Sequence, residues 1–141
     1  MNMMEMVLAM FAIVLFTTLS LTYNQAIWAQ TDYLNNSTLV VQASQICHSI
    51  LDEADAKLFS KQLAFSDLLT EYNFSRTQTY PHLPITFNVQ SVAIDCDESG
   101  TPLAMPDSLS LYKRVTITVS GHSYLQRPYT MQRIFIETTF R

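Results

Sequence analysis

Charge is almost missing from the start of this chain. From residue 6 to residue 31 the sequence contains no Asp, Glu, Lys or Arg, and the only charged side chain before this run is Glu5. At the rise of an α-helix the run spans about 39 Å, which exceeds the hydrocarbon core of a bilayer, about 30 Å thick. The sequence therefore predicts a membrane-competent helix, and we assign residues 1–31 to this segment.

Glycine and proline are also scarce. The chain has two glycines and five prolines, and neither residue type occurs before Pro81. Nothing in this part of the sequence forces a break, so the helix is predicted to continue to about residue 60. So few glycines also exclude a glycine-rich phosphate-binding loop.

Positive charge is not clustered anywhere. The formal net charge is −4, and the eight Lys and Arg residues form no run. Binding to nucleic acid normally needs clustered positive charge, so we predict no nucleic-acid partner. The histidines, His48, His82 and His122, follow no metal-ligand spacing. No set of residues forms a catalytic motif, and we expect a protein that is not an enzyme and has no cofactor.

Beyond the uncharged run the apolar residues follow a period of 3.6. This pattern is typical of an amphipathic helix with one buried face. A short second helix at residues 63–72 either follows the first helix or continues it. The residues of the predicted stripe are Tyr33, Val40, Ala43, Cys47, Ile50, Leu51, Ala54, Leu58, Phe65, Leu68, Leu69 and Tyr72.

After Pro84 the period changes from 3.6 to 2, which is typical of strands. We predict a linker at residues 73–84 and strands at residues 85–94, 109–120 and 129–140. Consecutive strands with short connections usually pair, so we expect an antiparallel sheet of three to four strands. The predicted class is α+β: a long N-terminal helix, with residues 32–141 forming an amphipathic helix packed on this sheet.

The first residues resemble the mature N-terminus of type IV pilins and pseudopilins. Those chains begin with Phe or Met, carry Glu at the fifth position and continue as an apolar helix. Met1, Glu5 and the apolar residues 6–21 match this pattern, whereas Asn2 stands where pilins usually have Thr. The match covers about the first quarter of the chain, and a long helix on a small antiparallel sheet is also the pilin architecture.

The resemblance implies a structural subunit of a type IV pilus-like filament or a secretion pseudopilus. The subunit would lie in the inner or cytoplasmic membrane before assembly, and in an extracellular or periplasmic homo-oligomeric filament afterwards. Met1 and Glu5 would be the assembly residues, because a carboxylate near a bilayer needs a partner such as an α-amino group or a helix N-terminus. The alternative is a bitopic membrane protein whose extracytoplasmic domain binds a partner without polymerising.

The chain has only two cysteines, Cys47 on the apolar stripe and Cys96 at a strand end. In an extracytoplasmic domain an even number of cysteines favours a disulfide, which would tie the helix to the sheet. The alternative is a pair of free thiols, with Cys47 as a small core residue. We predict the disulfide.

Asp95, Asp97, Ser99 and Gly100 have the spacing that begins a calcium-binding loop. A full loop needs a bidentate Glu at its twelfth position, where this chain has Pro106. A polar β-turn that ends at glycine explains the same residues. We prefer the turn and predict no metal, with calcium as the alternative.

Overall fold

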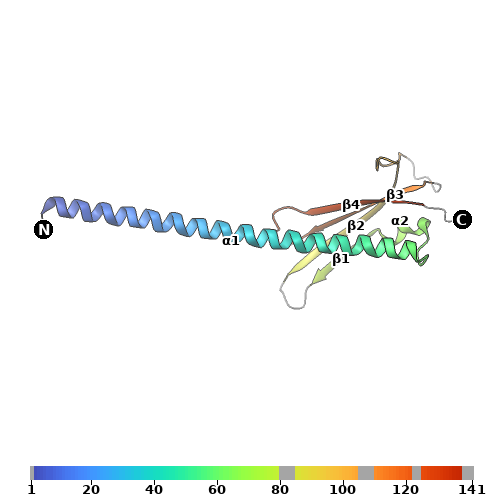
Figure 1. Ribbon diagram of the computed structural model, residues 1–141, viewed down its shortest axis with the longest axis horizontal. Helices are drawn as coiled ribbons and strands as arrows, with labels where there is room; N and C mark the ends of the chain where they lie inside the picture. The colour runs from blue at the N-terminus through green and yellow to red at the C-terminus, as the bar shows by residue number, and fades with distance from the viewer. Residues whose placement is uncertain (1, 80–84, 105–109, 122–124, 138–141) are drawn as a thin grey trace. The chain divides into compact units, whose positions relative to one another are not determined.

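The computed structural model describes residues 2–79, 85–104, 110–121 and 125–137. The predicted α+β class is confirmed, because a long helix is followed by an antiparallel sheet with the strand order β1-β2-β3-β4 (Figure 1). The elements in chain order are α1 (Met3–Phe59), η1, a 3-10 helix (Phe65–Asp67), α2 (Leu68–Glu71), β1 (Phe74–Thr79), β2 (Thr86–Cys96), β3 (Tyr112–Ser120) and β4 (Tyr129–Ile136).

The chain divides into two compact units, residues 1–37 and residues 38–141, and α1 contributes to both. Among the described residues of the first unit, no side chain is buried. By length and composition α1 can cross a membrane, and its most apolar stretch lies near the N-terminus. This confirms the prediction of a membrane-competent helix.

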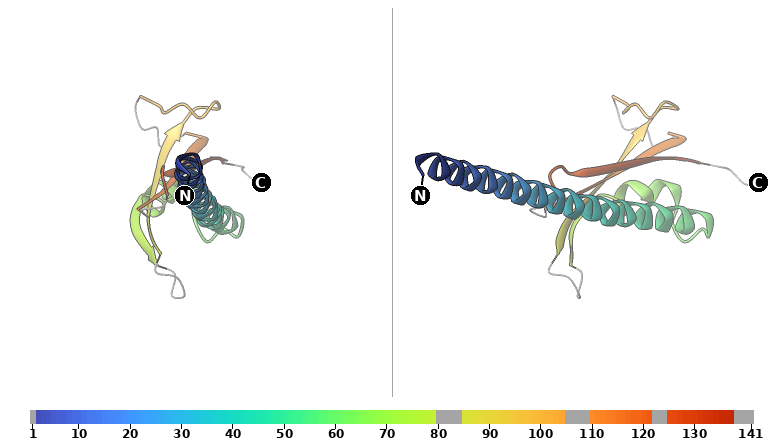
Figure 2. Two further views of the ribbon diagram at one scale, coloured as in Figure 1. Left: turned by 90° about the vertical axis from the view of Figure 1, so that its left-hand side faces the viewer. Right: turned by 60° about the vertical axis from the view of Figure 1, so that its left-hand side comes forward.

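The second unit has a hydrophobic core between α1 and one face of the sheet. Figure 2 shows the backbone of the helix and the strands from two further sides. Strand residues alternate between the two faces, so every second residue of β2 and β3 points toward the helix. The helix contributes Leu39, Ala43, Ile46, Cys47, Ile50, Leu51 and Ala54. The two central strands contribute Phe87, Val89, Ala93, Val115, Ile117 and Val119.

The predicted linker at residues 73–84 is wrong over its first half, because β1 occupies Phe74–Thr79 and pairs antiparallel with β2. Residues 80–84 lie outside the described part of the chain. Most side chains of β1 are polar and exposed, so its sequence carries no apolar alternation. The side chain of Asn73 aligns the strand instead: its amide group donates to the Ala93 carbonyl (3.2 Å) and accepts the Ala93 N–H (2.9 Å).

The other three predicted strands correspond to β2, β3 and β4, although residue 109 of the prediction for β3 and residues 138–140 of the prediction for β4 lie outside the described part of the chain. The short second helix predicted at residues 63–72 is present as η1 and α2. Between it and α1, Lys61 has a φ of 58°, a left-handed conformation that usually favours glycine. The N–H groups of Gln62 and Leu63 donate back to the Lys57 carbonyl and close the end of α1.

Candidate functional site

Glu5 lies in the first turn of α1 and forms part of a capping box. The carbonyl of Asn2 accepts the N–H groups of Glu5 (2.9 Å) and Met6 (3.2 Å), which makes Asn2 the N-cap of the helix. In return, Oε2 of Glu5 accepts the backbone N–H of Asn2 (3.1 Å). The carboxylate thus satisfies a free N–H of its own helix and faces the positive end of the helix dipole. Met1, the other predicted assembly residue, lies outside the described part of the chain.

From residue 6 to residue 16 the helix surface is apolar on all sides, and the threonine hydroxyls that follow are bonded within the helix. Thr17 donates to the carbonyl of Ile13 (2.7 Å), and Thr18 donates to that of Val14 (2.7 Å). Thr22 likewise donates a hydrogen bond to the carbonyl of Thr18 (2.9 Å). A polar group in hydrocarbon must be satisfied internally, and these hydroxyls meet that condition. This surface is therefore compatible with lipid or with the apolar face of another helix.

Comparison of the chain with protein-family models, with curated proteins and with solved structures gives no match. Any assignment of function therefore depends on the residue pattern and the geometry of the chain itself.

The structure does not contain the predicted disulfide: Cys47 and Cys96 are both free and buried. The Sγ atom of Cys47 lies 4.0 Å from the carbonyl oxygen of Ile117, which pairs with Ser91 of β2. Cys96 lies five residues further along β2, about 17 Å at the rise of a strand. A disulfide needs two Cα atoms within about 7 Å of each other, so this register keeps the thiols apart.

The contacts around Asp97 are those of a turn, the interpretation that the sequence favoured over a calcium loop. Its Oδ1 accepts the N–H groups of Ser99 (2.9 Å) and Thr101 (2.8 Å) and the Ser99 hydroxyl (2.6 Å). These hydrogen bonds, first that of the Ser99 hydroxyl, lower the pKa of the Asp97 carboxyl. Among the described residues no group of three or more His, Cys, Asp or Glu side chains is arranged to hold a metal ion.

Asp95, the other carboxylate of the calcium alternative, belongs to a buried ion pair that the sequence analysis did not predict. Its Oδ1 lies 2.8 Å from Nζ of Lys113, its register partner in β3, and both side chains are about 5% exposed or less. The ammonium group also lies 5.3 Å from the ring centroid of Phe65 in η1. The buried pair thus joins the ends of two strands beside the short helix.

Arg133 links the sheet to the helix. It lies on β4, and its guanidinium group contacts the carboxylates of Asp52 (2.9 Å) and Asp55 on α1. The hydrogen bond to Asp52, followed by that to Asp55, raises the pKa of Arg133 above its ordinary value. These contacts tie the last two turns of α1 to the edge strand.

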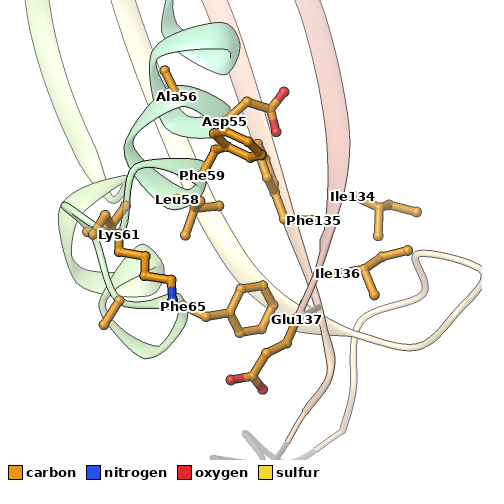
Figure 3. Close-up of a pocket in the computed structure, with 12 residues that line it drawn as sticks. Asp55, Ala56, Leu58, Phe59, Lys61, Phe65, Ile134, Phe135, Ile136 and Glu137 are labelled. Atoms are coloured by element: carbon orange, nitrogen blue, oxygen red, sulfur yellow. The ribbon is translucent and has the colours of Figure 1, made fainter. Parts of the chain in front are cut away.

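A cleft of about 1260 Å³ lies beside this contact, between the end of α1 and strand β4 (Figure 3). Its walls are mostly apolar, with Phe59, Phe65 and Ile136 among them. Among the residues that the structure describes, the charged groups at the cleft are Asp55, Lys61 and Glu137, and Asp55 is already paired with Arg133. These mostly apolar walls suit an apolar side chain.

The first prediction concerns the cysteines. Denatured protein that has not been reduced is expected to titrate two free thiols per chain, and the Cys96→Ser variant one. In the native protein both should react slowly with an alkylating reagent at neutral pH, because burial raises the pKa of Cys47 to about 11 and also raises that of Cys96. Finding no free thiol in the denatured monomer would contradict the free thiols and show that Cys47 and Cys96 form a disulfide.

The second prediction concerns the buried ion pair. Lys113→Met leaves the Asp95 carboxylate buried and unpaired, so it should lower the free energy of unfolding by about 3–5 kcal/mol in urea titrations. Adding Asp95→Leu should recover most of this loss, because no stranded charge then remains. The matched control is Lys57→Met, which breaks the exposed Glu53–Lys57 pair on α1 and should cost only about 0.3–0.5 kcal/mol. Equal losses in the two single variants would contradict a structural role for the buried pair.

Proposed function

We propose that this chain is a structural subunit of a type IV pilus-like filament or of a secretion pseudopilus, without catalytic activity of its own. The subunit would be held in the membrane by the first part of α1 before assembly. It would then leave the lipid and join a helical bundle of copies, with the sheet domains on the outside. Glu5 is the residue that we assign to recognition between copies.

One observation carries the proposal. From residue 6 to residue 16 every side chain of α1 is apolar and exposed, whereas in the second unit α1 buries one stripe against the sheet. A helix that is apolar all round needs lipid or other helices as its surroundings. A repeating assembly of copies supplies such surroundings outside the membrane, since each helix can cover its neighbours.

The capping box determines what Glu5 can still do during assembly. A carboxylate has two oxygens and about four acceptor positions, so it can accept an ammonium group of a neighbouring copy while Oε2 holds the N–H of Asn2. A pair of this kind, removed in part from water, sets the register between copies more than it adds net stability, because the cost of desolvation offsets much of the Coulomb attraction.

The second candidate is a bitopic membrane protein that binds a partner through its outer domain. Two observations favour it. The carboxylate of Glu5 is already satisfied within its own chain, so a lone copy leaves no stranded charge. The cleft beside β4 also offers the domain an apolar surface for a partner side chain.

The third prediction tests the two candidates through Glu5. Glu5→Gln keeps an acceptor for the N–H of Asn2, since Gln also completes a capping box, but it removes the charge. Glu5→Ala removes both the acceptor and the charge. Both variants are expected to insert into the membrane and to fold normally, and both should lose filaments. Breaking one side of such an ion pair costs about 3–5 kcal/mol, enough to reduce assembly more than a hundredfold.

The measurement is electron microscopy of surface filaments, with immunoblots of the subunit that stays in the membrane. Asp32→Asn is the matched control, because it removes the first carboxylate after the uncharged run and should leave filaments normal. Normal filaments from Glu5→Gln would contradict charge pairing. Normal filaments from both Glu5 variants, or no filaments from the unchanged chain, would favour the bitopic alternative.

A further inference from the structure

Three aromatic side chains follow the most apolar part of α1 at equal intervals. They are Tyr23, Trp28 and Tyr33, and each lies five residues after the one before. All three residues are strongly exposed, at 68%, 71% and 71% of their full accessible area. Large aromatic side chains with this exposure need an environment that accepts both an apolar ring and a polar atom.

The three rings are distributed around the helix. An interval of five residues turns the helix by about 140° beyond one full turn, so the rings point to three different sides. Contact with a single neighbouring helix would gather such residues on one face. A bilayer boundary surrounds a membrane helix on every side, and it is the environment in which Trp and Tyr are enriched.

The position of the rings along the helix matches the thickness of a bilayer. From Glu5 the helix rises by about 27 Å to Tyr23, about 35 Å to Trp28 and about 42 Å to Tyr33. A hydrocarbon core is about 30 Å thick, and a whole bilayer about 40–45 Å. With Glu5 at one boundary of the hydrocarbon, Trp28 therefore lies in the opposite headgroup layer. Asp32, the first charge after the run, then lies toward water.

We infer that Tyr23 and Trp28, which lie on either side of the far hydrocarbon boundary, form an aromatic collar that binds the headgroup layer of a phospholipid bilayer and sets the depth of α1, with Tyr33 on the aqueous side of the collar. The indole N–H of Trp28 and the phenol group of Tyr23 would bond to phosphate or ester oxygens, while the two rings cover the upper acyl chains. The collar rests on the membrane-bound state in the proposed function. It does not depend on whether copies later form a filament.

Trp28 is the only tryptophan of the chain, so the tryptophan fluorescence reports the depth of this residue in the bilayer. The full chain is reconstituted into phosphatidylcholine vesicles that contain lipids brominated near the headgroup, at mid-chain or near the end of the acyl chain. The fluorescence of Trp28 should be quenched most by the bromines nearest the headgroup, and its emission should shift to the blue relative to the unfolded chain. Acrylamide in the water should quench it only in part.

Two double variants move the tryptophan along the same helix. Phe16→Trp with Trp28→Phe places it about 17 Å from Glu5, close to the bilayer centre, where the deepest bromines should quench most. Asn35→Trp with Trp28→Phe places it about 45 Å from Glu5, where acrylamide should quench strongly and the bromines should not.

The outcomes separate the collar from the rest of the proposal. If Trp28 is quenched most by deep bromines, or by acrylamide alone, while the tryptophan at position 16 is quenched by deep bromines, the collar is wrong and the membrane helix stands. If neither tryptophan is quenched by any brominated lipid, the collar and the membrane helix fail together. Quenching of Trp28 at headgroup depth supports the collar even if the Glu5 variants show that no filament forms.

Discussion

The structure depends on one constraint: a single helix has to meet two different environments. Over residues 2–37 its side chains are exposed on every side, and over the second unit one stripe is buried against the sheet. Apolar burial stabilises by about 25 cal/mol per Å², so the buried stripe supplies much of the stability of the small domain, while the first unit has no such contribution of its own. The first unit therefore presents an apolar surface that the single chain does not cover.

The polar groups of the chain follow from this division. In the first unit, the Thr hydroxyls and the Glu5 carboxylate are bonded within the helix, which lowers the cost of placing them in or beside lipid. In the second unit, charged groups join elements that are distant in sequence: Arg133 binds two carboxylates of α1, and Lys113 binds Asp95 across two strands. In the first unit a charged group caps the N-terminus of α1, and in the second unit charged groups connect the helix to the sheet and one strand to the next.

The sequence predicted those features that depend on local periodicity, namely the long helix, three of the four strands and the turn at Asp97. It did not predict β1, because this strand is polar and is held by pairing with β2 and by the clamp of Asn73 on Ala93. The cysteines were paired wrongly because periodicity does not give the register of a helix against a strand. The cap at Glu5 had a visible signal, since Asn2 precedes Glu5 by the spacing of a capping box. The role proposed for Glu5 depends on contacts with a second copy, which periodicity within one chain does not describe.

The most direct test of this account compares residues 38–141 with the full chain. The shorter fragment contains the buried stripe and the sheet but lacks the exposed apolar unit. It should be a soluble monomer in sedimentation experiments, should unfold cooperatively in urea and should not bind phosphatidylcholine vesicles, whereas the full chain should partition into the vesicles. A fragment that aggregates, unfolds without cooperativity or binds the vesicles as strongly as the full chain would contradict the division of α1 into a membrane or filament part and a domain part.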